Sequence, residues 1–262
     1  MSAASSGEKL IAGIAGYLSE SRKAVVFTGA GISTESGIPD FRSPGGVWSR
    51  YRPVLYQDFL ASEQARKQYW LMKKEGYREL KGAKPNDGHR ALATLEAAGR
   101  IVAVITQNID GLHKDAGNKR VLELHGTSRH CICLECGARC DPDLVQERLE
   151  AGVEVPRCDK CGGLLKSGTV SFGQALPADV LTDAIELCIQ TDLMLAIGSS
   201  LVVEPAASLP LQAKHNGARL VIINKTETPL DYLADIVVRE PIGETLTRVI
   251  KRLRLPDLTI DQ

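Results

Sequence analysis

Four short apolar runs constrain the fold of this chain more than any other feature of its sequence. They cover residues 24–27, 101–105, 193–197 and 220–223, and each is hydrophobic almost without interruption. Strands covered on both faces of a sheet have this pattern, whereas strands with one face in solvent alternate apolar and polar residues. Segments with the helical spacing of apolar residues lie around these runs, at residues 8–19, 88–98, 178–190 and 243–253. The alternation predicts an α/β fold with a Rossmann-like, doubly wound parallel sheet.

Two segments interrupt this alternation and predict a second, smaller domain. Residues 43–87 are polar, rich in aromatic residues and broken by Gly and Pro, which indicates a loop followed by a small helical excursion. Residues 127–167 hold most of the cysteines and indicate a zinc ribbon. Both segments lie between sheet elements, so we expect them to pack together. The remaining residues, 1–42, 88–126 and 168–262, would form a discontinuous Rossmann-like domain.

The charge balance argues against two classes of partner. The chain has 32 Lys and Arg residues and 32 Asp and Glu residues, so its formal net charge is zero. Proteins that rely on bulk electrostatic attraction to nucleic acid or to anionic membranes carry an excess of positive charge. We therefore expect neither nucleic acid nor a membrane as a partner, and the oligomeric state stays open.

Composition also predicts where the protein works. No apolar run approaches the roughly 20 residues that a membrane span requires, and the first residues are unlike a signal peptide. Most of the seven cysteines crowd into one short segment instead of spreading along the chain as a disulfide framework would. We therefore expect a soluble, cytoplasmic protein.

The spacing of these cysteines is the most specific local signal. Two pairs, each with two intervening residues, are separated by 21 residues, and their members are Cys133, Cys136, Cys158 and Cys161. Four thiolates complete the tetrahedral coordination of one Zn²⁺ ion per chain and leave no position for substrate, so the predicted site is structural. Cys131 and Cys140 are alternative ligands, and buried thiols without a metal are the competing interpretation. Cys188 lies in a predicted helix and is expected to be a core residue.

A glycine-rich turn follows the first apolar run. Gly29-Ala30-Gly31 ends that run and opens toward Gly37, so backbone amides there could approach a pyrophosphate closely. The ordinary dinucleotide-binding fingerprint would have a third glycine where this chain has Thr34. A tight turn without a ligand is the alternative interpretation, but the position after a strand in an α/β pattern favours a dinucleotide site.

Polar residues stand directly after the other predicted strands. They are Gln107-Asn108-Ile109-Asp110, Gly198-Ser199-Ser200 and Asn224. The carboxyl ends of parallel strands form the ligand crevice of an open sheet, and amide, carboxylate and hydroxyl groups suit ribose and carboxamide ligands. Each cluster taken alone is explained by the polar end of a strand, but together with the glycine turn they form a constellation. His125, at the border of the cysteine-rich segment, can face the same crevice.

The ordered set of motifs resembles the sirtuin family of NAD-dependent protein deacylases. The motifs are residues 29–42, residues 106–113, residues 123–126, the paired cysteines, Phe172-Gly173 and Gly198-Ser199-Ser200. They follow in the family's order, and the resemblance covers nearly the whole chain. It implies an NAD-dependent protein lysine deacetylase in which NAD is a co-substrate and an acetylated lysine in a protein or peptide is the partner. Nicotinamide would leave, the acyl group would pass to ADP-ribose, and the lysine would be freed.

The resemblance also implies roles for individual residues. His125 would be the general base, and Asn108 and Asp110 would line the nicotinamide pocket. The substrate peptide and its acyl-lysine would be held by Val170, Phe172 and Gly173. The residues in contact with NAD would be Gly29, Ala30, Gly31, Thr34, Asp40, Phe41, Arg42, Gln107, Ile109, Gly198, Ser199, Ser200, Asn224 and Ile242.

Two departures from the family pattern bear on specificity. Members that act on succinyl- or malonyl-lysine carry a tyrosine and an arginine with two residues between them, whereas here Tyr69 is followed by Met72. We therefore expect acetyl-lysine to be preferred over acidic acyl groups. Gln174 stands where glutamate is more usual, which removes one negative charge beside the peptide channel. The competing interpretations are a mono-ADP-ribosyltransferase, a deacylase for other acyl-lysines, and a zinc-ribbon module that binds nucleic acid on an inactive scaffold.

Overall fold

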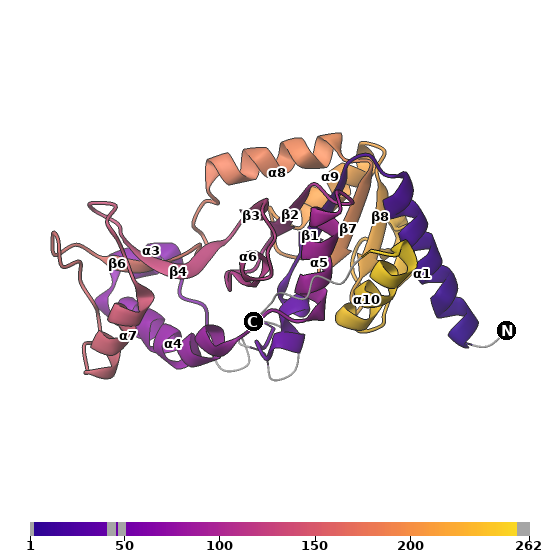
Figure 1. The fold of residues 1–262 in the computed structure, drawn as a ribbon. Helices are drawn as coiled ribbons and strands as arrows, with labels where there is room; N and C mark the ends of the chain where they lie inside the picture. Colours follow the sequence, from indigo (N-terminus) through magenta and orange to yellow (C-terminus); the bar gives the residue numbers. More distant parts are fainter. Residues whose placement is uncertain (1–2, 41–45, 47–50, 256–262) are drawn as a thin grey trace.

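The computed structural model describes residues 3–40, 46 and 51–255 of the chain. Its larger sheet has six strands in the order β3-β2-β1-β7-β8-β9 (Figure 1). The strands are β1 (Ala24–Thr28), β2 (Ala103–Thr106), β3 (Val121–Glu123), β7 (Leu193–Ile197), β8 (Arg219–Ile223) and β9 (Ile236–Val238). Every strand of this sheet pairs in parallel with its neighbours, which confirms the predicted Rossmann-like α/β fold.

Alternate side chains of the central strands face two separate cores. In β1, Val26 belongs to one core, whereas Val25 and Phe27 belong to the other. Helices α1, α5 and α10 fill the first core, and α8 and α9 fill the second, so both faces of the sheet are covered (Figure 1). Their bounds are α1 (Ala3–Glu20), α5 (Asp87–Ala97), α8 (Ala178–Gln190), α9 (Ser208–His215) and α10 (Ile242–Leu253). All five residues of β1 are buried, which accounts for the apolar run over residues 24–27.

Some elements agree with the sequence pattern to the residue and others have no sequence signal. The helix at 178–190 and the strand at 193–197 have the predicted bounds. The sequence does not predict β3 and β9, because three residues are too few to show a periodicity. It does not predict α9 either, because Pro210 indicates a break, although proline is tolerated in the first turn where it lies. No helix in the described part of the chain combines the length and the apolar character of a membrane span.

A second, antiparallel sheet lies beside the first, at the left of Figure 1, in the order β5-β4-β6. Its elements and the helices around it are α3 (Tyr56–Ala61), α4 (Glu63–Gly82), β4 (Gly126–Cys133), β5 (Arg139–Cys140), α7 (Pro142–Glu150) and β6 (Leu165–Thr169). The small helical excursion expected from the sequence is in fact dominated by the 20-residue α4, which Ser62 caps by accepting a hydrogen bond from Ala65 N. Phe59 and Trp70 from the helices share one core with Cys131 and Val145.

Ion pairs line the contact between α4 and the cysteine-rich segment. Lys67 Nζ lies 2.6 Å from Glu154, Arg78 lies 3.6 Å from Glu150, and Lys81 pairs with Asp143. These pairs are largely exposed, so solvent screens them and they contribute little to stability. The shared apolar core is therefore the stronger link, and helices and cysteine-bearing strands form one packed unit.

Candidate active site

The glycine turn lies where the strand order of the large sheet reverses, between β1 and β7. Gly31 N–H donates to the Gly198 carbonyl at 2.8 Å, and Gly29 N–H donates to the Ile197 carbonyl at 3.1 Å. A Cβ on Gly29 or Gly31 would stand 2.8 Å from the Gly198 oxygen, closer than real Cβ contacts. Gly198 itself has φ +63, which favours glycine. Two of the predicted NAD-contacting segments are thus in backbone contact at the switch point of the sheet, where ligands of this fold class bind.

The turn continues into a 3₁₀ helix, η1 (Ala30–Ser36), rather than into a longer α-helix. Thr34, which stands where the third fingerprint glycine would be, donates its hydroxyl hydrogen bond back to the Gly31 carbonyl at 2.9 Å. Gly37 ends η1 in the left-handed region at φ 83. Asp40 is the last described residue of this segment, and the predicted NAD contacts Phe41 and Arg42 lie outside the described residues.

Asn108 and Asp110, which follow β2, meet a serine from η1. The amide of Asn108 donates to Ser33 Oγ at 3.0 Å, and Ser33 Oγ donates to Asp110 Oδ2 at 2.8 Å. The other oxygen of Asp110 accepts the Leu112 N–H at 2.8 Å. All three polar side chains of this network are buried. Burial raises the pKa of Asp110 above its ordinary value, because a charged carboxylate loses water there, although Leu112 and Ser33 partly oppose the shift.

His125 is held by the backbone of the same loop. Its Nδ1 lies 3.0 Å from the carbonyl oxygen of Gln107. A carbonyl only accepts, so the proton of the neutral ring is on Nδ1, and Nε2 keeps a free lone pair. Burial lowers the pKa of His125 below its ordinary value. Gln107 also donates from its side-chain amide to Ser199 Oγ at 2.8 Å, which ties the loop after β2 to the loop after β7.

The remaining predicted NAD contacts lie around this centre. Asn224 follows β8 and donates from its amide to the Thr226 carbonyl at 2.9 Å. Ile242 begins α10 and is buried in the first core. The Ile109 carbonyl accepts from both the N–H and the hydroxyl of Ser128, each at 2.8 Å. Ser200 is half-buried after β7. These residues follow the carboxyl ends of β2, β7, β8 and β9.

One residue beside Ser200 has an unusual backbone conformation. Leu201 is one of two non-glycine residues with positive φ among those described, at φ 52, and its N–H donates to Ser199 Oγ at 3.2 Å. A left-handed leucine is strained, and such residues concentrate at functional sites. The strain therefore marks this loop as part of the site.

The predicted substrate residues run along the segment that follows β6. Val170 N–H donates to the His125 carbonyl at 2.8 Å, so the predicted base and the predicted peptide clasp are joined directly. Phe172 is 41% exposed although it is aromatic, which suits a side chain that meets a partner. Gly173 has φ 78. Gln174 accepts the Ser171 N–H with its side-chain oxygen at 3.1 Å, so its amide closes this turn.

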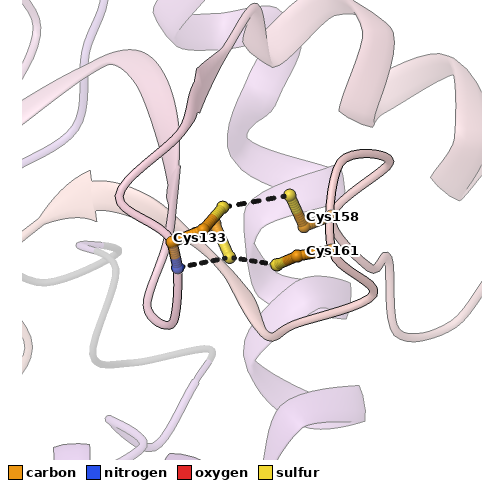
Figure 2. Close-up of side chains that lie close together, drawn as sticks. Cys133, Cys158 and Cys161 are labelled. Atoms are coloured by element: carbon orange, nitrogen blue, oxygen red, sulfur yellow. Dashed lines mark hydrogen bonds between the residues drawn. The ribbon is translucent and has the colours of Figure 1, made fainter.

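The four predicted zinc ligands form a compact cluster. Their sulfur atoms all lie within 4.8 Å of one another, with 3.5 Å between Cys133 and Cys161 and 3.8 Å between Cys136 and Cys158. Figure 2 shows the Cys133 side chain on one loop facing Cys161 on the other, with Cys158 beside Cys161. Tetrahedral zinc with Zn–S bonds of about 2.3 Å requires sulfur separations of about 3.8 Å. The donors and their spacing fit a structural zinc ion.

Cys131 and Cys140 do not belong to this cluster, which answers the alternative that the sequence left open. They are direct partners across the antiparallel pair β4–β5, with their side chains in or against the core of the small unit. Cys188 is fully buried in the second core of the large sheet, as expected. All seven cysteines are free thiols in the structure.

Two residues of the site carry no usable sequence signal. Ser33 joins Asn108 to Asp110, and both residues lie more than 70 positions from Ser33 in the chain. A serine inside a glycine turn does not indicate partners this distant in the sequence. His113, in the short helix α6 (Leu112–Asp115), is buried and contacts Thr28 at the end of β1. The position of His113 near the Asn108–Asp110 cluster in the sequence is only a weak indication of a role. The contact with Thr28 arises from the way the fold places α6 against the end of β1.

A family model and named relatives from two organisms all relate this chain to the same family. The model of the Sir2 family matches residues 29–205. A protein of Thermodesulfovibrio yellowstonii named NAD-dependent protein deacetylase is 48% identical over 233 residues, covering 89% of this chain and 91% of its own length. A protein of Rhodopseudomonas palustris with the same name is 50% identical over 224 residues, covering 85% and 88%.

The solved structures similar to this chain include Sir2 complexes. Sir2 with a p53 peptide and NAD⁺ has a TM-score of 0.85 at 42% sequence identity, covering 92% of this chain and 97% of that one. Sir2 bound to an acetylated peptide has a TM-score of 0.84 at 41% identity, covering 92% and 98%. The similarity therefore spans both sheets.

Proposed function

This chain belongs to the Sir2 family, and we propose that it removes acetyl groups from protein lysines in an NAD-dependent reaction. Its relatives are named for this activity, and similar structures hold NAD⁺ or an acetylated peptide. NAD is the co-substrate, an acetylated lysine in a protein or peptide is the partner, and zinc is structural. The observation that carries the proposal is the half-buried His125, which presents a free Nε2 lone pair beside the Asn108–Ser33–Asp110 network.

The large sheet would bind NAD through the ends of β1, β7 and β8. Gly29 and Gly31 donate their N–H groups to the Ile197 and Gly198 carbonyls and pack closely against Gly198, so they would hold the turn at the carboxyl end of β1, where the pyrophosphate is expected. Ser199, Ser200 and Asn224 would serve the ribose hydroxyls with hydroxyl and amide groups. Thr34, Asp40, Phe41, Arg42, Gln107, Ile109, Gly198 and Ile242 complete the proposed set.

NAD supplies the ADP-ribose that accepts the acetyl group, and nicotinamide is its leaving group. Asn108 and Asp110 would hold the nicotinamide carboxamide, which needs one donor and one acceptor at fixed positions. Ser33 orients both side chains at once, since it accepts from Asn108 and donates to Asp110. Burial excludes water from these groups, which strengthens their hydrogen bonds.

His125 would act in the following step as the general base. Its Nδ1–H is engaged by the Gln107 carbonyl, so only Nε2 accepts a proton from a ribose hydroxyl. By then the acyl oxygen would have displaced nicotinamide from the anomeric carbon of the ribose and left an imidate. The deprotonated hydroxyl would attack the imidate carbon, and addition of one water with loss of the lysine amine would complete the acetyl transfer. The same Gln107 carbonyl stabilises the imidazolium that results, because its oxygen carries partial negative charge. A lowered pKa keeps the ring neutral before the step.

The substrate peptide would lie along Val170, Phe172 and Gly173. An extended peptide binds such a segment through backbone hydrogen bonds, so recognition does not require charge. This agrees with the zero net charge of the chain. The reaction class is transfer of an acetyl group to ADP-ribose, and a cytoplasmic location is proposed because the cysteines cluster in a metal site instead of forming a disulfide framework. The proposed division of the chain assigns residues 43–87 and 127–167 to the small domain.

The test is a product balance. The zinc-loaded protein is incubated with an acetyl-lysine peptide and NAD, and products are quantified by mass spectrometry, with the unacetylated peptide as control. We expect nicotinamide, deacetylated peptide and O-acetyl-ADP-ribose in equal amounts. A peptide that gains ADP-ribose would support mono-ADP-ribosyl transfer instead, and the absence of all three products would refute the proposal.

The acyl preference is a finer prediction. Position 72 offers a methionine, which has no charge for an acidic acyl group. The neighbouring Lys73 donates from Nζ to Thr169 Oγ1 at 3.2 Å, so this cation is already engaged within the small unit. We expect faster deacylation of an acetyl-lysine peptide than of the same peptide with succinyl-lysine. Faster desuccinylation under matched conditions would contradict this preference.

A further inference from the structure

The pairing of β4 with β6 is irregular over its first half. Gly126 pairs with Thr169 and Cys131 pairs with Ser167, so five positions along β4 correspond to two positions along β6. Irregularities of this kind take residues out of the ladder, and beside active sites they often turn a side chain toward the site. Residues 127–130 of β4 are therefore available for contacts outside the small sheet.

Two of these residues bind the backbone of the loop after β2. Ser128 donates from both its N–H and its hydroxyl to the Ile109 carbonyl, each at 2.8 Å. Arg129 donates from Nε to the Asp110 carbonyl at 2.8 Å. These hydrogen bonds join the small unit to a loop of the large sheet. The small unit thus holds the backbone of two consecutive residues of the proposed NAD site.

Arg129 also contacts the far end of the short helix that follows this loop. Its guanidinium pairs with Asp115, the last residue of α6. A Cβ on Gly111 would stand 2.6 Å from Arg129 Nε, so the guanidinium packs directly against the backbone between Asp110 and α6. A guanidinium is planar, always charged and only donates, so one orientation serves both contacts. One side chain therefore spans the segment from Asp110 to Asp115.

Arg129 completes a set of three donors around Asp110. One carboxylate oxygen accepts from the Leu112 N–H and the other from Ser33, while the backbone carbonyl accepts from Arg129. Burial raises the pKa of Asp110, and the positive charge of Arg129 is among the influences that oppose this rise. Of the three donors, Arg129 is the one that comes from the small unit. Its loss would release the backbone of Asp110 and leave both carboxylate hydrogen bonds in place.

We propose that Arg129 is a positioning residue for Asp110, and that Ser128 supports it by holding the neighbouring carbonyl. The proposal rests on the proposed role of Asp110 at the nicotinamide group. A backbone shift at Asp110 would move its carboxylate relative to the carboxamide, so nicotinamide binding should weaken. The substrate peptide would lie along the segment after β6, so its binding should change little.

The test compares Arg129→Met with Arg148→Met. The first variant removes the donors and keeps the apolar stem, whereas the second removes an arginine whose hydrogen bonds go to Asp159 and the Arg157 carbonyl within the small unit. We expect Arg129→Met to raise the nicotinamide concentration at half-maximal exchange into NAD by about fivefold, because the lost hydrogen bond is charged but only partly buried. The KM for the acetyl-lysine peptide should stay within about twofold of wild type. Arg148→Met should change neither value.

A third variant separates the Asp110 contact from the ion pair. Asp115→Asn removes the charge that pairs with Arg129 and leaves the hydrogen bond from Nε to the Asp110 carbonyl. Both side chains of the pair are well exposed, and exposed ion pairs contribute little, so we expect this variant to bind nicotinamide as the wild type does. A shift in Asp115→Asn as large as that in Arg129→Met would overturn the proposal.

Hydrogen–deuterium exchange gives a readout that does not depend on activity. In the ligand-free protein we expect backbone amides of residues 108–115 to exchange faster in Arg129→Met than in the wild type or in Arg148→Met. Unchanged amide exchange in this segment would overturn the proposal. Thermal unfolding of each variant reports general destabilisation separately.

The nicotinamide measurement decides the functional part. An unchanged half-maximal concentration in folded Arg129→Met would overturn the proposal, and so would an equal rise in the KM for the peptide. If Arg129→Met fails to fold, Ser128→Ala takes its place, with an expected rise of about twofold because the N–H bond to the Ile109 carbonyl remains. If the wild type makes no O-acetyl-ADP-ribose, the proposed function fails instead, while amide exchange still tests the hold on Asp110.

Discussion

The contact between His125 Nδ1 and the Gln107 carbonyl sets the chemistry of the site at the scale of single residues. It fixes which nitrogen is free, and burial keeps that nitrogen unprotonated. A histidine on the surface would be partly charged near pH 6.5 and would present either nitrogen. The same loop places Asn108 and Asp110, so the proposed base and the proposed nicotinamide-binding groups are all held by one short segment after β2.

The lowered pKa of His125 predicts the pH dependence of acetyl transfer. A pKa below 6.5 means that the imidazole stays neutral, and active as a base, to lower pH than an exposed histidine. The acid limb of kcat/KM for O-acetyl-ADP-ribose formation should therefore fall below pH 6.5. Exchange of nicotinamide into NAD precedes the base step and should not share this limb. A limb centred at or above pH 6.5 would contradict the assignment.

The candidate site residues were predictable from the sequence, but the contacts between them were not. Asn108 and Asp110 are predictable as a polar cluster because polar groups after buried strands gather at one edge of a parallel sheet. His125 follows β3, which shows no sequence pattern, so its role is predicted from the motif resemblance alone. The role of Ser33 was not predictable, since a serine carries no information about partners that the fold brings from another strand. The same reason hides His113, whose partner Thr28 ends a different strand.

At the scale of elements, the site depends on how closely the loops after β1 and β7 approach. Glycine is required at 29, 31 and 198, because the backbones touch there. The sequence predicts this turn, because Gly-Ala-Gly directly after a buried strand is typical of a tight turn. It does not predict that η1 is a 3₁₀ helix, because that depends on Ser33 turning inward toward Asp110.

Gly31→Ala tests this close approach. Its Cβ would stand 2.8 Å from the backbone of Gly198, so the two loops must separate. We expect the KM for NAD to rise by about tenfold or more, the order that overpacking by 1–3 kcal/mol implies. Gly16→Ala in α1 is the matched control, because nothing lies within 4 Å of its added Cβ. It should leave the KM unchanged, and equal behaviour of the two variants would contradict the close-approach argument.

Zinc removal tests the unity of the small unit. Cys133 and Cys158 belong to the same core as Phe59 and Trp70, so loss of the metal should loosen α3 and α4 together with the cysteine strands. Hydrogen exchange after chelation should show lost protection in β4, β6 and α4, with α1 and α10 unchanged. Protection that persists in α4 would show that the helices are stable without the metal.

Substitution of single cysteines distinguishes loss of the metal from loss of any one thiol. Cys136→Ser removes one ligand and should reproduce the exchange pattern of the chelated protein. Cys188→Ala is the control, since this thiol is buried in the core of the large sheet and contacts no ligand cysteine in the described structure. It should retain one zinc ion per chain.

At the scale of the whole molecule, the two sheets are connected through the proposed base and the proposed substrate-binding segment. His125 directly precedes β4, and Val170 directly follows β6. The hydrogen bond from Val170 N–H to the His125 carbonyl, at 2.8 Å, joins the segment that enters β4 to the segment that leaves β6. The base and the substrate clasp would therefore move together if the small unit shifts, while the proposed NAD site stays on the large sheet.

The parallel sheet was predictable at this scale because its buried strands are continuous apolar runs. The small unit was predictable only as a cysteine cluster and a helical segment. Its shared core joins residues from 59 to 165, and a discontinuous core of this kind leaves no periodic pattern in the sequence. For this unit, the order of the motifs along the chain predicted the zinc ribbon and the helical insertion, which the periodicity of apolar residues could not.

The most direct measurement of the central claim, that the site divides the reaction between two groups of residues, is a split assay of His125→Ala. The variant is incubated with acetyl-lysine peptide, NAD and labelled nicotinamide, and both exchange and O-acetyl-ADP-ribose are quantified. We expect label to enter NAD while O-acetyl-ADP-ribose falls by at least about 100-fold, the contribution typical of a general base. Undiminished O-acetyl-ADP-ribose would contradict the assignment of the base, and loss of both signals in a folded variant would contradict the division of labour.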